Sequence, residues 1–524
     1  MRVKECSLGK VLIQLLEQQN VKYVFGIPGV HTVELYRALS GSKIRHITSR
    51  HEQGAGFMAD GYARLSGKPG VCIVITGPGM TNVLTAMAQA RSDSIPMLVI
   101  SGVNKLRDTH KQRSPLHDLP NQRKLVKQVA IASYTIKEIG QTHLIINKAF
   151  SKMMSRKPGP VHVQIPIDIM MQTIPETTKL QSIRKKSLAP KQSEILTVSD
   201  AINKSKNPCI ILGGGARSAK EKIKKFVEKL QAPTVSTVNA RDLLGRHELH
   251  IPASPSLKPV RQLLKQADLV LALGTEMGQT DYDMYEDGLF PDLKNLIRVD
   301  IDEHQLAQSP PRTQNVIGEI NAFCDEILKH IRPKHNSMGK NLVKICTTSV
   351  KLEIPTHYKA CELLLSTIIS NLPEAILIGD STQPTYYGNL YCEITDKNRW
   401  FNSATGFGTL GYAIPASIGA QLAGLDKTII CIIGDGGLQF TLAELGTAID
   451  ESIPVIFLVW SNSEYKEIRT FMESQSITPI GVSPKPPKLK LTAKSYGIEY
   501  KNPKSASKLS RILQEFNKNR RPLI

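Results

Sequence analysis

Short runs of apolar, often β-branched residues recur along the chain, and segments of helical length separate them. In the first third, Gly70–Thr76 and Met97–Ser101 are such runs, and Thr81–Ala90 between them is predicted to be a helix opened by Gly77-Pro78-Gly79. Runs of this kind are typical of parallel strands that are buried on both faces. Their alternation with helices favours an α/β fold in which helices cover a parallel sheet.

The same alternation continues to the end of the chain. Two polar stretches with little periodicity interrupt it, Ile174–Ser193 and Arg332–Lys340, and we interpret both as linkers. They divide 524 residues into three segments of ordinary domain size. We therefore predict three doubly wound parallel-sheet α/β domains, at 1–173, 194–331 and 341–524. The further predicted strands are Cys209–Leu212, Leu269–Leu273, Leu296–Ile301, Ala375–Ile378, Thr428–Ile433 and Pro454–Trp460.

The strongest local motif is Gly434-Asp435-Gly436-Gly437, which directly follows an apolar predicted strand. A glycine-rich turn between a strand and a helix presents backbone N–H groups to a phosphate. The next predicted strand is followed by Ser461-Asn462, and neighbouring parallel strands end at the same edge of a sheet. Mg²⁺ prefers hard oxygen ligands and often shares them with phosphate. The pattern predicts that Asp435 and Asn462 lie together at such a site, although the glycine triplet alone is more often a simple turn.

The triplet Gly434-Asp435-Gly436, together with Asn462 after the following predicted strand, resembles the signature of thiamine-diphosphate-dependent enzymes. Other segments resemble the acetolactate synthase and 2-oxo acid decarboxylase superfamily, in that superfamily's order and over essentially the whole chain. They are Gly26–Gly29, Arg50–Gln53, Ala59–Arg64, Gly77–Asn82 and Gly408–Ala416. The resemblance implies that the first domain binds the pyrimidine ring of the cofactor, that the second is the middle domain, and that the third binds the diphosphate. It also implies a homodimer or homotetramer with active sites between subunits.

The resemblance assigns a role to each matching residue. Glu52 matches the glutamate that hydrogen-bonds the pyrimidine ring of thiamine diphosphate and supports general acid–base chemistry there. Leu410 matches the apolar residue beneath the thiazolium ring. Gly408, Gly436 and Gly437 are expected to bind the cofactor through their backbones. The expected Mg²⁺ ligands are Asp435, Asn462 and the backbone carbonyl of Glu464.

The implied chemistry begins with a small-molecule 2-oxo acid. Four segments resemble the branch named for 5-guanidino-2-oxopentanoate decarboxylase, which acts on the 2-oxo acid of arginine. They are Gly29–Tyr36, Thr280–Tyr285, Gly379–Pro384 and Asn402–Leu410. The leading hypothesis is therefore a lyase that decarboxylates such an acid non-oxidatively, releasing CO₂ and an aldehyde. The alternatives are an acetolactate-synthase-like carboligase that joins two 2-oxo acids, and a catalytically silent paralogue, against which the intact Glu52, Asp435 and Asn462 argue.

Residues on the substrate's side are less clearly marked. His31 is the expected proton donor because imidazole titrates near neutral pH, with ordinary packing as the alternative. A guanidinium group is best bound by carboxylates or carbonyls in a planar arrangement. The candidates for that contact are Asp281, Asp283, Asp380, Glu464 and Glu467. Gln112, Arg113 and His117 lie in a polar stretch to which no role is assigned.

Three features depart from the family pattern. Ser461 stands where an asparagine is frequent, but the ligand corresponds to Asn462, so metal binding is expected to survive. Gly213–Ala216 follows a predicted strand without the dinucleotide-binding fingerprint and is interpreted as a tight turn; FAD remains open there but has no motif support. The sequence ends at Arg520–Ile524, within what resembles the family's last strand, so no long carboxyl-terminal lid is expected.

The chain carries 67 Lys and Arg residues against 46 Asp and Glu residues, a net charge of +21, which raises nucleic acid or an anionic membrane as a partner. The basic residues are dispersed, as in Lys220–Leu230, where they alternate with acids, and aromatic residues make up 5%. No apolar run reaches the roughly 18–20 residues that span a bilayer. We expect neither a nucleic-acid nor a membrane partner. Eight scattered cysteines and a start unlike a signal peptide predict a cytoplasmic protein.

Overall fold

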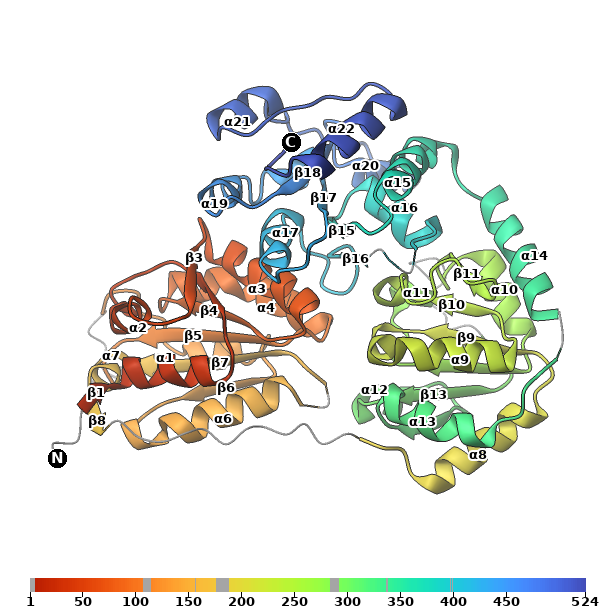
Figure 1. Cartoon of the computed structure of the whole chain (residues 1–524), viewed down its shortest axis with the longest axis horizontal. Coiled ribbons are helices and arrows are strands. Elements are labelled where there is room, and N and C mark those ends of the chain that lie inside the picture. The colour runs from red at the N-terminus through yellow and green to blue at the C-terminus, as the bar shows by residue number, and fades with distance from the viewer. Residues whose placement is uncertain are drawn as a thin grey trace. The chain divides into compact units, whose positions relative to one another are not determined.

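The structure, a computed structural model, describes residues 5–106, 115–155, 157–175, 188–282, 292–335, 338–395, 397 and 399–524 (Figure 1). Its internal contacts divide the chain into two compact units. The first unit comprises Met1–Lys185, Gly406–Lys501 and Arg520–Ile524, and the second comprises Lys186–Thr405 and Asn502–Asn519. No helix within the described residues is both long and apolar enough to cross a membrane.

The first unit contains a six-stranded parallel sheet with the strand order β3-β2-β4-β5-β7-β6. A short antiparallel pair, β1 (Glu5–Ser7) with β8 (Thr173–Pro175), lies apart from it. The six strands are β2 (Tyr23–Gly26), β3 (Arg45–Thr48), β4 (Gly70–Val74), β5 (Met97–Val103), β6 (Ala132–Thr135) and β7 (Pro160–Pro166). The helices between them are α1 (Leu8–Gln18), α2 (Val33–Leu39), α3 (Glu52–Ser66), α4 (Pro78–Ser92), α5 (Gln122–Val126), α6 (Thr142–Met153) and α7 (Ile167–Met170).

Helices cover both faces of this sheet, α1 and α6 on one side and α3 and α4 on the other (Figure 1). Alternate residues of a strand point to opposite faces. Accordingly, Val71 and Ile73 of β4 pack in one apolar cluster with residues of α1, α2 and α6. Cys72, between them, faces α3 and its thiol lies 3.5 Å from the carbonyl oxygen of Ala55. This two-sided burial explains why β4 and β5 are almost continuously apolar.

The strand order reverses beside β2. The chain passes from β2 to β3 on one side, and β4 then pairs with the other side of β2. In open α/β sheets the crevice at such a reversal, at the carboxyl ends of the strands, is the usual ligand site. The loops that leave β2 and β4 there carry Gly26–His31 and Thr76–Gly79.

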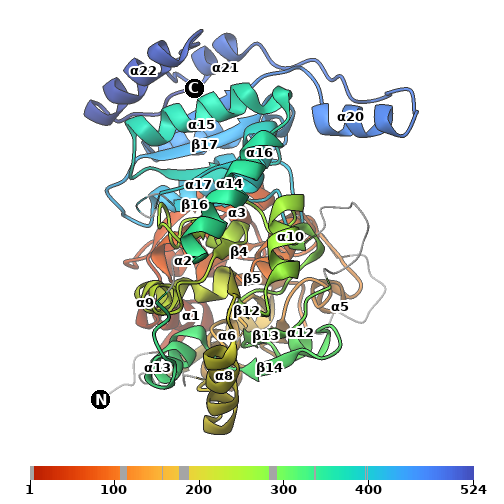
Figure 2. The same ribbon diagram turned by 90° about the vertical axis from the view of Figure 1, so that its right-hand side faces the viewer.

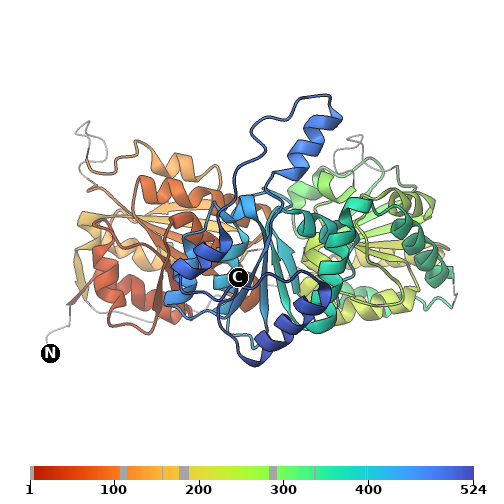
Figure 3. The same ribbon diagram turned by 90° about the horizontal axis from the view of Figure 1, so that it is seen from above.

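The remainder of the first unit contains two paired parallel strands, β17 (Ile429–Gly434) and β18 (Val455–Trp460). Both are apolar and largely buried. Figure 3 shows α20 on an arm that stands away from these strands, and no residue of α20 is buried. The helices here are α17 (Ala413–Gln421), α18 (Asp435–Leu438), α19 (Glu444–Asp450), α20 (Lys466–Ser474) and α21 (Leu489–Ser495).

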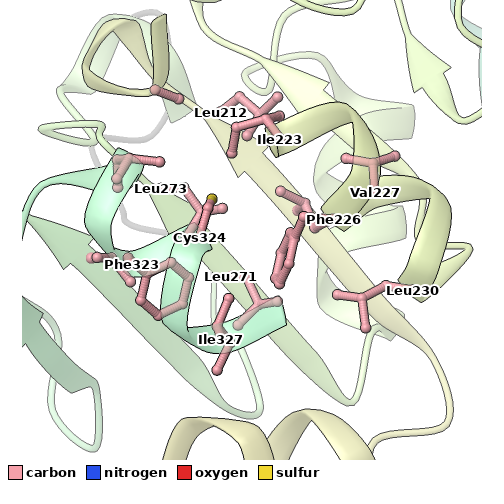
Figure 4. Packing of buried hydrophobic residues seen from close by; sticks show 14 of the residues in the cluster. Leu212, Ile223, Phe226, Val227, Leu230, Leu271, Leu273, Phe323, Cys324 and Ile327 are labelled. Carbon is pink, nitrogen blue, oxygen red and sulfur yellow. The ribbon is translucent and has the colours of Figure 1, made fainter. Parts of the chain in front are cut away.

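The second unit contains another six-stranded parallel sheet, of order β11-β10-β9-β12-β13-β14. Ile210 and Leu271 pack on one face with residues of α8 (Gln192–Lys204), α9 (Lys220–Leu230) and α13 (Ile320–His330). These residues include Phe226 and Phe323, whose ring centroids lie 6.3 Å apart (Figure 4). Cys209, on the other face, packs with residues of α10 and α14. The strands are β9 (Pro208–Leu212), β10 (Thr234–Ser236), β11 (His250–Ile251), β12 (Leu269–Leu273), β13 (Leu296–Asp300) and β14 (Gln314–Ile317).

The second unit also contains the parallel pair β15 (Ile376–Gly379) and β16 (Arg399–Asn402). Its last helix, α22 (Ala506–Lys518), lies along α15 (Lys359–Asn371) (Figure 2). The other helices are α8 (Gln192–Lys204), α9 (Lys220–Leu230), α10 (Lys258–Gln266), α11 (Gln279–Tyr282), α12 (Glu303–Ala307), α13 (Ile320–His330), α14 (Met338–Leu352) and α16 (Gln383–Tyr391). Parallel strands with intervening helices thus recur in all three parts of the chain, which confirms the predicted fold class.

Candidate active site

Glu52 is the first residue of α3, and its carboxylate is buried. The helix begins here because the ring of His51 accepts a hydrogen bond from the backbone N–H of Gln53 (3.1 Å). Asn82 Nδ2, on α4, donates to Glu52 Oε2 (2.9 Å). A Cβ atom added at Gly79 would lie 3.3 Å from Glu52 Oε1. The carboxylate is therefore held in place beside the loop that leaves β4.

A second carboxylate, that of Glu444 on α19, holds the backbone just before α3. It accepts hydrogen bonds from the N–H groups of Arg50 and His51 (both 3.0 Å) and from Thr447 Oγ1 (2.8 Å). Burial raises the pKa of Glu444, and these hydrogen bonds act in the opposite direction. Gly54 makes room for the contact, because a Cβ there would lie 2.1 Å from Glu444 Oε1. Glu444 stands in no sequence motif and was not predicted to have a role.

The helices α3 and α17 touch backbone to backbone. A Cβ atom at Gly61 would lie 2.0 Å from the carbonyl oxygen of Ala416. At Gly419 it would lie 1.8 Å from the carbonyl oxygen of Met58. Only glycine permits such an approach. Two of the segments that carried the family resemblance therefore meet here and hold α3 against the part of the chain that bears Gly408 and Leu410.

A buried polar network reinforces this contact. Arg64 donates to Asp60 Oδ1 (2.6 Å) and to Asp93 Oδ2 (2.5 Å), and the hydroxyl of Tyr412 also donates to Asp60. Gln89 Nε2 donates to Asp93 Oδ2 (2.8 Å). Burial raises the pKa of Asp60, and the charge of Arg64 opposes that shift. Buried charges are tolerated when they are paired and hydrogen-bonded in this way.

The loop that precedes α17 is fixed by Gln89. Both the backbone N–H and Oγ1 of Thr409 donate to Gln89 Oε1 (3.3 and 3.1 Å). Gly408 and Gly411 have φ angles of +73° and +77°, which favour glycine. Leu410 lies between them and is half-buried. The positions of the predicted cofactor-binding residues Gly408 and Leu410 thus depend on a glutamine that the sequence analysis did not single out.

Asp435 and Asn462 leave the same edge of the β17–β18 pair. Asp435 is buried, and its Oδ2 accepts hydrogen bonds from Ser461 Oγ (3.0 Å) and from the backbone N–H of Ser463 (2.8 Å). Asn462 lies between these two serines in the sequence, so the structure brings the predicted pair together. Ser461, which departs from the family pattern, orients the aspartate.

Glu464 extends this set through its backbone. Its N–H donates to Asn462 Oδ1 (3.3 Å), while its carboxylate forms ion pairs with Lys466 (3.2 Å) and Arg469 (2.5 Å). An aspartate, an asparagine and a backbone carbonyl are hard oxygen donors of the kind that Mg²⁺ prefers. In the part of the chain that the structure describes, no group of three or more His, Cys, Asp or Glu side chains is placed to hold a metal. A cation here would thus depend on this mixed set.

Gly436 and Gly437 are buried in α18, directly after Asp435. A Cβ atom at Gly436 would lie 2.5 Å from Cε1 of Tyr465, so the ring of Tyr465 requires a glycine at this position. The strand, turn and helix sequence is the arrangement that exposes N–H groups to phosphate. The residues present therefore fit a diphosphate bridged by a divalent cation.

His31 is buried in the loop that leaves β2. Its Nε2 lies 2.9 Å from Asn104 Oδ1, and its ring centroid lies 5.5 Å from that of His117. The fold therefore brings His117, which was noted only as part of a polar stretch, next to His31. Asn104, at the end of β5, is a further residue that sequence reasoning missed, because it stands in no motif.

The candidates for a guanidinium contact are divided between the two units. Asp281 and Asp380 belong to the second unit. Burial raises the pKa of Asp281 to about 7, with Arg241 opposing the shift, and Asp380 accepts a hydrogen bond from the N–H of Ser381 (2.9 Å). Glu467 is the second residue of α20, and the carboxylate of Glu464 is engaged in the ion pairs described above. Asp283, Gln112 and Arg113 lie outside the described residues.

The glycines of Gly213–Ala216 serve close packing. A Cβ atom at Gly213 would lie 2.1 Å from the carbonyl oxygen of Gly274, and one at Gly215 would lie 3.0 Å from its Cα. The loops that leave β9 and β12 therefore press against one another. This contact accounts for the tight turn that the sequence predicted without invoking a nucleotide.

Three family models match the chain. Residues 6–126 match the thiamine pyrophosphate enzyme, N-terminal TPP binding domain. Residues 195–327 match the central domain of that family, and residues 380–524 match its C-terminal TPP binding domain.

Curated relatives are similar over nearly the whole chain. A probable 2-ketoarginine decarboxylase of Pseudomonas aeruginosa is 37% identical over 98% of this chain and 92% of its own length. The acetolactate synthase isozyme 1 large subunit of Escherichia coli is 30% identical over 88% of this chain and 82% of its own. A probable acetolactate synthase large subunit of Methanococcus aeolicus is 28% identical over 97% and 89%.

Proposed function

This chain belongs to the thiamine pyrophosphate enzyme family, and from that premise we propose that it decarboxylates a 2-oxo acid non-oxidatively, releasing CO₂ and an aldehyde. The observation that carries the proposal is the 37% identity to a probable 2-ketoarginine decarboxylase across almost the full length of both chains. The acetolactate synthases are less similar, at 30% and 28%. The first substrate to test is therefore 5-guanidino-2-oxopentanoate.

When bound, thiamine diphosphate supplies the nucleophile and the electron sink that decarboxylation needs. Glu52, buried and oriented by Asn82, would hydrogen-bond the pyrimidine ring. Gly408 would meet the same ring through its backbone, and Leu410 would offer an apolar contact to the thiazolium ring. His31 would exchange protons with the substrate.

At the other end of the site, Asp435, Asn462 and the carbonyl of Glu464 would hold Mg²⁺, and Gly436 and Gly437 would offer N–H groups to the diphosphate. The observations in favour are the burial of Asp435 and its contacts with the segment that contains Asn462. The donor set is composed of hard oxygens.

We also propose domain bounds, an oligomeric state and a cellular compartment. The domain bounds 1–173, 194–331 and 341–524 each enclose one matched family model. We expect a homodimer or homotetramer in the cytoplasm. All eight cysteines are free thiols in this structure and all are buried, which suits a reducing compartment. FAD stays open as an occupant of the middle domain, without a motif to support it.

A second candidate, a carboligase that joins two 2-oxo acids, is favoured by the similarity to acetolactate synthases. One experiment separates the two. Purified protein with thiamine diphosphate and Mg²⁺ is given a panel that contains 5-guanidino-2-oxopentanoate, pyruvate and branched 2-oxo acids, and CO₂, aldehyde and acetolactate are measured. We expect CO₂ and the matching aldehyde from the guanidino acid. Acetolactate from pyruvate as the main product would overturn the proposal, and so would an absence of CO₂ from every acid.

A further inference from the structure

The side chain of His31 is almost fully buried, with 3% of its surface exposed. Its Nε2 lies 2.9 Å from Asn104 Oδ1. Its Nδ1 is also buried, and among the described residues it has no hydrogen-bond partner. The two nitrogens of the ring therefore differ: Nε2 is paired with Asn104, and Nδ1 has no hydrogen-bond partner among the described residues.

The orientation of the Asn104 amide decides which nitrogen carries the hydrogen. Asn104 Nδ2 lies 3.1 Å from the backbone carbonyl oxygen of Leu116. A carbonyl oxygen only accepts hydrogen bonds, so the NH₂ group of Asn104 must face Leu116 and Oδ1 must face His31. Because Oδ1 also only accepts, His31 must donate from Nε2. Neutral His31 is thus the Nε2–H tautomer, and Nδ1 presents a lone pair.

Close backbone packing fixes the position of the ring. Gly102, two residues before Asn104, lies under the His31 backbone, because a Cβ atom there would be 1.9 Å from the His31 carbonyl oxygen. A Cβ atom added at Gly77 would likewise lie close to His117, 2.6 Å from its carbonyl oxygen. Two residues farther along, a Cβ at Gly79 would lie 3.3 Å from Glu52 Oε1. His31, whose ring contacts that of His117, therefore belongs to the same loop cluster as Gly77 and Gly79, beside Glu52.

We propose that Asn104 is a positioning residue that keeps a hydrogen on Nε2 of His31 and thereby makes Nδ1 the atom that carries protons to the substrate. The proposal rests on the proposed function. Decarboxylation breaks a C–C bond and releases CO₂, and the bound cofactor would accept the electron pair until the substrate carbon is protonated. A C–H bond forms there with the proton from Nδ1, and Nδ1 regains a proton from water. Nε2 keeps its hydrogen throughout, so Asn104 holds the ring in both charge states.

Nitrogen NMR tests the tautomer without relying on turnover. The full-length protein with thiamine diphosphate and Mg²⁺ is labelled with ¹⁵N-histidine, and the signal that His31→Gln removes is assigned to His31. We expect the Nε2–H tautomer in the wild type, loss of that fixed tautomer in Asn104→Leu, and its retention in Asn104→Asp, which keeps an acceptor. A wild-type Nδ1–H signal, or an unchanged signal in Asn104→Leu, would overturn the proposal.

Kinetics with the best substrate of the panel supply the second test. Asn104→Leu should lower kcat at least about 10-fold, and by no more than the about 10²–10⁴-fold that general acid–base catalysis contributes as a whole. KM and cofactor affinity should change less than about threefold, and Asn104→Asp should recover most of kcat. The matched control is Asn341→Leu at an exposed position of α14, which should behave as wild type. Unchanged kcat in Asn104→Leu would refute the positioning role while leaving the decarboxylase activity standing.

If the wild type turned over no acid, the proposed function would fail. The tautomer measurement would still decide the role of Asn104, so the two failures are distinguishable.

Discussion

At the scale of single residues, the neighbouring polar groups set the position of the Glu52 carboxylate. Asn82 holds one of its oxygens, and Glu444 holds the backbone that leads into it. An acid–base group is effective when it is oriented before the substrate arrives. The surrounding polar residues thus matter as much as the carboxylate itself.

The variant Glu52→Gln tests this residue directly. It keeps the shape and the hydrogen bond to Asn82 but removes the charge. Turnover should fall by about 10²–10⁴-fold, the usual contribution of a positioned acid or base, while the unfolding midpoint and the amount of bound cofactor stay near wild type. The matched control is Glu221→Gln at an exposed position on α9. Wild-type turnover in Glu52→Gln would contradict the assignment.

His162 predicts how stability responds to acid. It is fully buried in β7 between the hydroxyls of Ser101 and Ser133 (2.9 Å each), and burial lowers its pKa from 6.5 to about 3. Below about pH 6.5 the unfolded chain therefore binds a proton at His162, whereas the folded chain binds it only as the pH approaches 3. Stability should fall as the pH is lowered from 6.5 towards 3, by up to about 1.4 kcal/mol per pH unit.

Urea unfolding at pH 7, 6 and 5 measures this slope. His250 of the second unit, whose pKa burial lowers to about 4, adds a contribution of the same sign. The variant His162→Gln cannot take up the proton, so its stability should depend less steeply on pH, whatever its stability at pH 7. Equal slopes in the variant and the wild type would rule out His162 as a source of the effect.

At the scale of elements, the parallel pairing of β17 with β18 brings together residues that lie in different sequence motifs. It brings Asp435 to the segment that contains Asn462, and Ser461 and Ser463 then hold the aspartate. Parallel neighbours end at one sheet edge, which makes this juxtaposition a property of the topology.

The variant Asp435→Ala should therefore lose Mg²⁺-dependent retention of thiamine diphosphate while both strands remain folded. Cofactor that stays with the protein through gel filtration, in Mg²⁺ and in EDTA, measures the effect. We expect at least about a 10-fold weaker retention in Mg²⁺, since the loss of even an outer-sphere partner at a metal site costs about 10–100-fold. Asp200→Ala, on the exposed face of α8, is the control. Retention at the wild-type level would refute the metal role.

The contact between α3 and α17 makes a prediction about packing. In Gly419→Ala the new methyl group would meet the carbonyl oxygen of Met58 at 1.8 Å, so one helix must move. Overpacking of this kind costs about 1–3 kcal/mol. Chemical unfolding should show that loss, whereas Gly140→Ala, where an added Cβ meets no atom within 4 Å, should leave stability nearly unchanged. Wild-type stability in Gly419→Ala would show that the helices do not approach so closely.

Much of this architecture was predictable because the strands are buried on both faces and so are continuously apolar. Leu269–Leu273 was predicted to the residue. The helix predicted at Thr81–Ala90 begins earlier, at Pro78, because proline suits the first turn of a helix. Thr173–Pro175 overlaps the start of the predicted linker and forms a strand, since its partner is Glu5–Ser7 at the far end of the region.

Within the site, a residue could be predicted only where it stands in a sequence motif. Glu52, Asp435 and Asn462 stand in motifs and were predicted. Glu444, Gln89 and Asn104 are single polar residues without a local pattern. Their roles follow from partners that only the tertiary structure brings near, such as Thr409, which is 320 residues from Gln89. No periodicity or spacing in the sequence records such a contact.

At the scale of the whole molecule, the family resemblance implies active sites between subunits. Sedimentation of the purified protein with its cofactor should therefore give at least a dimer, and dilution that yields monomers should abolish turnover. The control is the same dilution with the cofactor and Mg²⁺ concentrations held constant. A monomer that remains fully active would contradict the prediction.

The contact between Glu444 and the backbone of Arg50 has a consequence for biosynthesis. The two residues are 394 positions apart, so the amino-terminal half of the site leaves the ribosome long before its anchor is made. At about 5–20 residues per second, the interval is about 20–80 s. During that time the nascent α3 lacks both Glu444 and the glycine face of α17. A chain cut short before residue 444 would thus retain Glu52 and Asn82 but lack the carboxylate that anchors the backbone before α3.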